Sequence, residues 1–287
     1  MRTTLRSLLT WAAIAGIVLC ALPTMAITRV FDRDPAQYRT GQLFRWWGAL
    51  VTRLNPAWHL TVSGAVPEDM RRPFVVVANH QSLGDIPVVC RLPGEMKWIV
   101  KKELFGAPVF GWLMRMAGDI SVNRRDAGSR ASVLPRAKDY LQKRCSVMFF
   151  PEGTRSRDGR VLRFAKGPFR LAVEAGVDVL PLAIDGTRGT LPKGGWRFDT
   201  DCNIRLKVLD PISPQGRNAE ALHAAARSVI VEQVAAWRGV APHRVDAQAP
   251  APGGAPEPRD DEDESAPTDG KESVNTAPSS VRPPAES

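Results

Sequence analysis

Short apolar runs alternate with helical patterns between about residues 60 and 238, and this alternation restricts the fold more than any other feature of the sequence. Three runs, at residues 74–78 (FVVVA), 146–150 (SVMFF) and 179–184 (VLPLAI), have the length and bulky apolar composition of buried strands. Strands separated by helices at this spacing are typical of a parallel sheet. The predicted fold class is therefore α/β, a single domain with a mostly parallel central sheet flanked by helices.

The segments between these strands have helical patterns. We expect helices at residues 85–91, 131–144 and 169–175, and a longer terminal helix at residues 220–237. Residues 204–208 alternate apolar with polar side chains, which predicts a late strand on the edge side of the sheet.

The amino terminus contains 20 consecutive uncharged residues, 8–27 (LLTWAAIAGIVLCALPTMAI). A helix of that length, rising about 1.5 Å per residue, would just cross a hydrocarbon core roughly 30 Å thick. A cleaved signal peptide is the alternative, because Arg2 and Arg6 precede the stretch and small residues surround Met25. The stretch exceeds the usual apolar region of a signal peptide, which favours an anchor. The sequence leaves open whether this helix spans the bilayer or embeds from one side.

A second segment, residues 42–54 (QLFRWWGALVTRL), has the pattern of an amphipathic helix. Trp46 and Trp47 belong to its apolar stripe and favour a bilayer interface, whereas Arg45 lies off the stripe. A packed core helix is the alternative. Residues 1–58 are therefore predicted to form a membrane-associating helical pair. More arginines follow the uncharged stretch than precede it, which predicts an inner-membrane location with the body facing the cytoplasm.

Charge is unevenly distributed along the 287 residues. Residues 245–287 contain 10 acidic and 3 basic residues, a net charge of −7, so the formal +9 of the chain leaves +16 on residues 1–244. A cationic body suits phospholipid headgroups, phosphorylated substrates or nucleic acid. Nucleic acid is disfavoured because no recognition motif is present. The tail is rich in proline and poor in large apolar residues, which predicts disorder.

Neither the cysteines nor the histidines have the spacing of a metal site or a disulfide framework. We therefore expect no metal and no tightly held cofactor. The residues concerned are Cys20, Cys90, Cys145, Cys202, His59, His80, His223 and His243.

His80 directly follows the strand predicted at residues 74–78, where α/β folds place reactive groups. If a helix starts near Ser82, its first turn brings Asp85 back towards the histidine. The Asp85 carboxylate could then accept from Nδ1–H and leave Nε2 as a general base. Asp85 could instead serve only as a partner of the helix dipole.

The strand predicted at residues 146–150 is followed by PEGTRSR, a tight turn in which Gly153 permits close approach of a ligand. Arg155 and Arg157 supply planar donors suited to phosphate. Arg124 also ends an apolar-alternating run that enters a loop. Because the carboxyl ends of parallel strands meet at one edge of a sheet, these groups are expected to converge with His80.

Four segments, in this order, resemble the ordered blocks of the glycerolipid acyltransferases, and in particular of the 1-acylglycerol-3-phosphate O-acyltransferases. They are residues 79–85 (NHQSLGD), 118–124 (GDISVNR), 150–156 (FPEGTRS) and 179–182 (VLPL). Residues 101–112 (KKELFGAPVFGW) also resemble the family, and the likeness spans about residues 30–210. One departure is Asn123, which stands where many members have an acidic residue.

The resemblance implies that His80 is the general base and that Asp85 holds it. It further implies that Arg124 and Arg155 bind the glycerol phosphate of a lysophospholipid acceptor. The donor would be acyl-CoA or acyl carrier protein, and residues 59–244 would be the catalytic domain. Three residues, Glu152, Gly153 and Thr154, would shape the site, and Pro181 would help to form the acyl-donor side.

Three alternatives remain open. The acceptor could be another lyso-lipid, such as a lyso-ornithine lipid or a lysophospholipid. The protein could be a membrane-anchored lipid hydrolase with Ser82 as nucleophile, although a helix N-cap explains Ser82 better. It could also be a non-enzymatic basic protein that binds membranes or nucleic acid.

Overall fold

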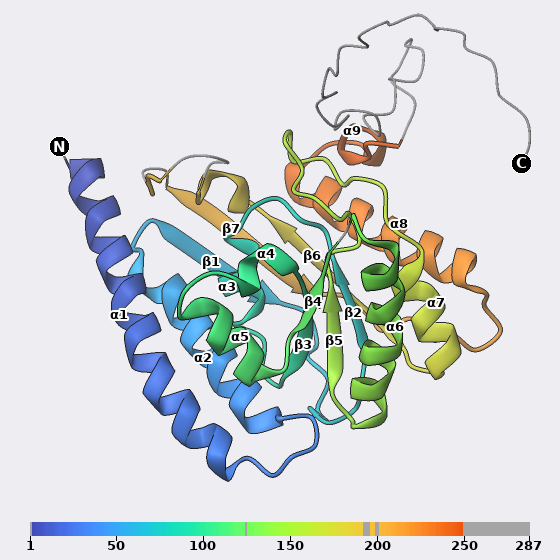
Figure 1. Cartoon of the computed structure of the whole chain (residues 1–287). Coiled ribbons are helices and arrows are strands. Elements are labelled where there is room, and N and C mark those ends of the chain that lie inside the picture. Colours follow the sequence, from blue (N-terminus) through green and yellow to red (C-terminus); the bar gives the residue numbers. More distant parts are fainter. Residues whose placement is uncertain (1, 124, 192–195, 199–200, 249–287) are drawn as a thin grey trace, which may run out of the picture. The chain divides into compact units, whose positions relative to one another are not determined.

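The computed structural model describes residues 2–123, 125–191, 196–198 and 201–248 (Figure 1). Its centre is a seven-stranded sheet in the order β1-β7-β6-β2-β5-β3-β4. Every neighbouring pair is parallel except β6 and β7, which confirms the predicted α/β fold class. The strands are β1 (Trp58–Ser63), β2 (Val75–Ala78), β3 (Met96–Lys101), β4 (Ile120–Val122), β5 (Ser146–Phe149), β6 (Val179–Asp185) and β7 (Cys202–Val208).

Helices cover both faces of this sheet (Figure 1). The helices are α1 (Arg2–Phe31), α2 (Tyr38–Leu54), α3 (Asp85–Val89), α4 (Lys102–Phe105), α5 (Phe110–Ala117), α6 (Ala127–Gln142), α7 (Gly167–Ala175), α8 (Ala219–Arg238) and α9 (Pro242–Val245), with a 3₁₀ turn η1 (Thr187–Gly189).

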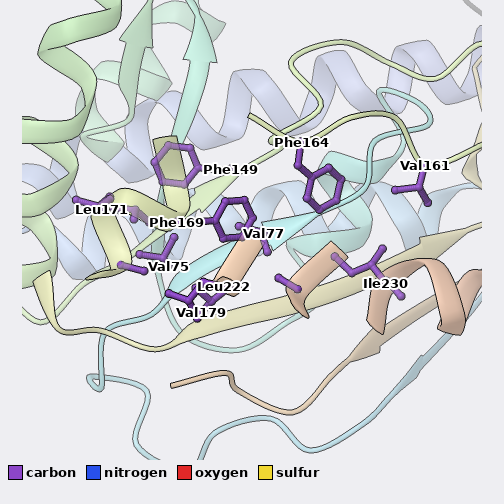
Figure 2. Packing of buried hydrophobic residues seen from close by; sticks show 14 of the residues in the cluster. Val75, Val77, Phe149, Val161, Phe164, Phe169, Leu171, Val179, Leu222 and Ile230 are labelled. Atoms are coloured by element: carbon purple, nitrogen blue, oxygen red, sulfur yellow. The ribbon is translucent and has the colours of Figure 1, made fainter. Parts of the chain in front are cut away.

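The alternation of side chains along β2 divides the core in two. Val75 and Val77 pack with residues of α6, α7 and α8, including Phe169 and Ile230 (Figure 2). Val76 and its neighbours on the other face pack with residues of α2 and α3. All four residues of β2 are buried, as expected for a central parallel strand covered on both faces.

The strand predicted at residues 204–208 forms, but its expected place at the edge side of the sheet is wrong. β7 lies between β6 and β1, and β1 is the edge strand. The alternating burial of β7 therefore reflects one buried face and one half-covered face. β1 was not predicted because most of its side chains are exposed and Trp58 is its only buried residue.

The predicted amino-terminal helical pair is present, and α1 extends further than residues 8–27. One flank of α1 packs on α2 and α5 through Ala21 and Met25, which contact the cluster around Phe44 and Leu113. Residues Thr4–Phe31 are long and apolar enough to cross a membrane, and 22% of the tested window is buried. Most of the α1 surface is therefore not covered by the protein.

In α2 the orientation differs from the predicted one. Arg45 is buried and forms ion pairs with Asp119 and with Glu95, whereas Trp46 is exposed. The helix turns its arginine towards the sheet because those two buried carboxylates lie there. The apolar stripe predicted to face a bilayer is left partly uncovered.

The packed body continues past residue 244, the boundary predicted from composition. Val245 is buried, and Asp246 forms an ion pair with Arg227 of α8. The rest of the predicted tail, residues 249–287, lies outside the described residues.

Candidate active site

The site lies at one edge of the sheet, where the adjacent parallel strands β6, β2 and β5 end. The loops that leave these strands are joined by hydrogen bonds. Ser156 N–H donates to the carbonyl of His80 at 2.9 Å, which ties the β5 loop to the β2 loop. The Asn79 side chain donates to Ile184 O at 2.8 Å and accepts from Ile184 N–H at 2.9 Å, which ties β2 to β6. The predicted convergence of the β2 and β5 exits is confirmed.

His80 and Asp85 form the predicted pair. The distance between His80 Nδ1 and Asp85 Oδ2 is 2.7 Å, and Asp85 is the first residue of α3. Oδ2 also accepts the backbone N–H groups of Gln81 at 2.7 Å and Ser82 at 3.0 Å. The side chain of Asp85 is fully buried, whereas 14% of that of His80 is exposed. An ionised carboxylate only accepts, so Nδ1 carries the hydrogen of this bond, and in the neutral imidazole the lone pair then lies on Nε2.

Two side chains that were not predicted hold this pair in place. The Thr187 hydroxyl donates to Asp85 Oδ1, so both carboxylate oxygens are occupied. The ring of Phe150 stacks on the imidazole, with ring centroids 4.1 Å apart and planes inclined by 19°. No local signal points to Thr187, because it is 102 residues from Asp85 in the sequence. Phe150 lies in a recognised segment, but nothing there shows that its ring faces a histidine.

Ser82 is not the helix N-cap that was predicted. The N-cap position is Gly84, and Ser82 Oγ accepts from Gly84 N–H at 3.2 Å. The same hydroxyl is 3.1 Å from Thr190 Oγ1 and is buried. Such a hydroxyl is poorly placed to attack a substrate, which argues against a hydrolase with Ser82 as nucleophile.

Glu152 lies behind His80. Its Oε1 accepts the backbone N–H of His80 at 3.0 Å, and its Oε2 is buried. Burial raises the pKa of Glu152 to about 8, with a further contribution from the negative charge of Asp85. The structure therefore places Glu152 where it can fix the backbone of the histidine.

A cavity of about 570 Å³ opens beside the pair. It is lined by Gln81, Arg155, Ser156, Arg157, Arg188, Gly189 and Leu191. In the described part of the chain, the guanidinium groups of Arg155 and Arg157 have no hydrogen-bond or ion-pair partner. These arginines can bind an anion next to His80, since Gln81 is adjacent to His80 in the chain.

The remaining predicted residues are placed as follows. Thr154 is exposed in the β5 loop. Gly153 has a φ of +72°, a conformation that favours glycine, and the space where a Cβ would lie is open. Pro181 is buried within β6 and pairs with Val77. Its carbonyl accepts from Leu209 N–H at 3.0 Å, so it lies inside the sheet, before the strand ends. Arg124 lies outside the described residues.

Among the described residues, no group of three or more His, Cys, Asp or Glu side chains is arranged to hold a metal ion. His80 can supply a base, and the arginines that line the cavity can bind an anion.

Comparisons with known proteins agree with this geometry. Residues 59–185 match the family model described as Acyltransferase. Lyso-ornithine lipid O-acyltransferase from Pseudomonas aeruginosa is 32% identical over 231 residues, which cover 74% of this chain and 87% of that protein. The chain belongs to the acyltransferase family. Fold and family therefore stand as predicted.

Further members of the family extend the likeness. The crystal structure of the 1-acyl-sn-glycerophosphate acyltransferase from Thermotoga maritima superposes with a TM-score of 0.71 at 30% identity, over 83% of this chain and 96% of that chain. A chloroplastic 1-acyl-sn-glycerol-3-phosphate acyltransferase from Arabidopsis thaliana is 40% identical over 162 residues, 56% of this chain and 45% of that protein. The chain spans about half the length of the first curated relatives that it matches.

Proposed function

We propose that this chain is a membrane-bound acyltransferase that acylates the sn-2 hydroxyl of 1-acylglycerol 3-phosphate and so produces phosphatidic acid. The donor is acyl-CoA or acyl carrier protein. The observation that carries the proposal is the His80–Asp85 pair, with Nε2 free to act as a base, beside an arginine-lined cavity.

In the proposed reaction His80 Nε2 takes the proton of the acceptor hydroxyl as its oxygen attacks the thioester carbonyl. Asp85 stabilises the imidazolium, as the aspartate does in a Ser-His-Asp triad. The tetrahedral intermediate then expels the thiolate, which takes the proton back from His80. The products are an ester and a free thiol, and no acyl-enzyme forms because the substrate hydroxyl is itself the nucleophile.

The acceptor phosphate is assigned to Arg155, together with Arg124. Glu152 acts through the backbone of His80. Gly153 and Thr154 shape the loop after β5, between Glu152 and Arg155. The assignment of Pro181 to the acyl-donor side stays a prediction, because Pro181 lies inside β6.

The membrane association is supported by the uncovered side of α1. Because its other flank packs on α2 and α5 along the body, we assign α1 to one leaflet, embedded from one side and on the cytoplasmic face of the inner membrane. Trp46 of α2 and Trp112 of α5 add exposed interfacial aromatics. The large apolar side chains exposed on α1 are Leu5, Leu8, Leu9, Trp11, Leu19, Ile27, Val30 and Phe31.

A second acceptor, a lyso-ornithine lipid, is favoured by one observation. The Pseudomonas aeruginosa relative with that name matches over 87% of its length, whereas the Arabidopsis thaliana relative matches over 45%. The chemistry at His80 would be the same for both acceptors.

The test is a paired assay on membranes that contain the wild type, His80→Ala or His59→Ala, with oleoyl-CoA and either acceptor. His59→Ala is the matched control, because His59 is exposed on the edge strand β1. Loss of the base should lower the rate about 10²–10⁴-fold without releasing the protein from membranes. Equal activity of His80→Ala and the wild type would refute the mechanism. Turnover with lyso-ornithine lipid alone would refute the acceptor and keep the chemistry.

A further inference from the structure

Arg188 adds a third guanidinium to the cavity from a different strand. It lies in η1, directly after β6, whereas Arg155 and Arg157 lie in the loop after β5. Arg188 is outside the four segments that resemble the family, and its side chain is exposed. The cavity is therefore lined by cations from two separate segments, the loop after β5 and η1 after β6.

None of these three arginines has a carboxylate partner among the described residues. Arg188 Nη1 donates to the carbonyl oxygen of Asp158 at 3.1 Å, which leaves its remaining N–H groups for another acceptor. The Asp158 carboxylate pairs with Arg160 instead. The carboxylate of Asp185, at the end of β6, pairs with arginines of β7 and α8. Three like charges without counter-charges around one cavity favour an anionic occupant.

The position of Arg188 is fixed relative to the catalytic pair. Its neighbour Thr187 is fully buried and donates its hydroxyl to Asp85. Gly186, on the other side of Thr187, has a φ of +84°, and a Cβ there would lie 2.0 Å from Asn203 O. The turn that carries Arg188 is therefore held by close packing against β7 and by the carboxylate that orients His80.

We propose that Arg188 determines acceptor specificity by completing, with Arg155 and Arg157, a site for a phosphate dianion. A phosphomonoester carries a charge of about −1.5 to −2 and three acceptor oxygens, which three guanidinium groups can share. An ornithine headgroup carries both a carboxylate and an ammonium, so it gains less from three cations. The inference rests on the proposed function. Gln81, the neighbour of His80 in the chain, lines the same cavity. The acceptor carries its phosphate on the carbon next to the reacting hydroxyl, whereas the phosphates of the donor are remote from its thioester, which favours the acceptor phosphate as the occupant.

The test compares the wild type, Arg188→Ala, Arg188→Lys and the control Arg217→Ala as full-length chains in mixed micelles. Arg217 is exposed in the turn before α8. This turn follows Ile212, which pairs with Val179 at the start of β6, whereas Arg188 follows the end of β6. This control removes the same charge at the opposite end of the sheet. The kinetic readouts are KM for lysophosphatidic acid, KM for oleoyl-CoA and kcat/KM for lyso-ornithine lipid.

We expect Arg188→Ala to raise KM for lysophosphatidic acid about 10–150-fold, the equivalent of one hydrogen bond to a charged group. KM for oleoyl-CoA and kcat/KM for lyso-ornithine lipid should stay within about threefold of the wild type. The KM of Arg188→Lys for lysophosphatidic acid should lie between those of the wild type and Arg188→Ala, because lysine keeps the charge and loses the planar donors. An unchanged KM for lysophosphatidic acid, a shift confined to oleoyl-CoA, or an equal effect of Arg217→Ala would each overturn the proposal.

Calorimetric titration of the same proteins with glycerol 3-phosphate separates this inference from the proposed function. If the wild type makes no phosphatidic acid but binds glycerol 3-phosphate through Arg188, the function falls and the anion site stands. If Arg188→Ala binds glycerol 3-phosphate as the wild type does, the anion site falls whatever the turnover.

Discussion

The hydroxyl of Thr187 offers a test of how the His80–Asp85 pair is held. Thr187→Val keeps the shape of the side chain and removes the hydrogen bond to Asp85 Oδ1. The other carboxylate oxygen keeps its three donors from His80, Gln81 and Ser82. The variant should therefore fold, with an Asp85 carboxylate that is buried and has lost its bond at Oδ1.

The expected loss of kcat follows from the negative charge of the Asp85 carboxylate, which accepts the hydrogen bond from Thr187. A hydrogen bond to a charged group contributes about 1.5–3 kcal/mol, and each 1.36 kcal/mol corresponds to about tenfold in rate. If the bond holds Asp85 in the position that stabilises the imidazolium, kcat should fall about 10–150-fold. KM should change little, because Thr187 is buried and cannot reach the substrate.

The assay measures kcat and KM with oleoyl-CoA and the lyso-lipid that the wild type acylates. Thr187→Ser keeps the hydroxyl and should recover most of the lost kcat. Thr52→Val is the matched control, since Thr52 is also buried and donates to Ala49 O at 2.7 Å, within α2. The reasoning is refuted if Thr187→Val keeps its kcat, if Thr187→Ser is equally impaired, or if Thr52→Val loses as much.

Two further predictions concern stability, and thermal unfolding in detergent checks both. Burial raises the pKa of Glu152 from 4.5 to about 8, so the wild type should lose stability as the pH rises through that range. Glu152→Gln stays neutral and can still accept a hydrogen bond from His80 N–H, so its stability should not fall in the same way. Parallel pH profiles of the two proteins would contradict this. Asp119→Asn should cost about 3–5 kcal/mol, or about 6–20 °C in Tm, because it removes one of the two buried carboxylates that pair with the buried Arg45. Asp139→Asn, which breaks an exposed pair with Lys143, should shift Tm only slightly; a similar shift in both would count against the argument.

The part of the fold that could be predicted lies in continuous apolar runs. β2, β5 and β6 are buried on both faces, so their sequences contain little else than bulky apolar residues. The position of His80 just after β2 and the five-residue step to Asp85 indicated a possible contact, and the resemblance to the family favoured it over a role for Asp85 at the helix dipole alone. Local signals work here because strand, turn and first helical turn are consecutive in the chain.

The rest depends on partners that are distant in the sequence. β1 became the edge strand, and β7 an interior one, through pairing between segments more than 140 residues apart, such as Trp58 with Cys202. Thr187 reaches Asp85 over a similar gap of 102 residues. No periodicity within a segment encodes such contacts. Arg45 was assigned to the polar side of its helix for the same reason, because Asp119 is 74 residues away.

The burial of Arg45 has a structural consequence if the site works at a membrane, as proposed. Four buried charged groups join α2 to the sheet: Arg45 of α2, Glu95, Lys97 of β3 and Asp119. Apolar residues of similar size could hold α2 as firmly, since burying charges is costly. An arginine fork that must meet two carboxylates permits only one register of α2. That register fixes the exposed apolar side of α1 relative to the strands whose ends carry His80. For an acceptor that stays in the bilayer, the distance between the apolar side of α1 and His80 decides whether the hydroxyl of the acceptor can reach Nε2.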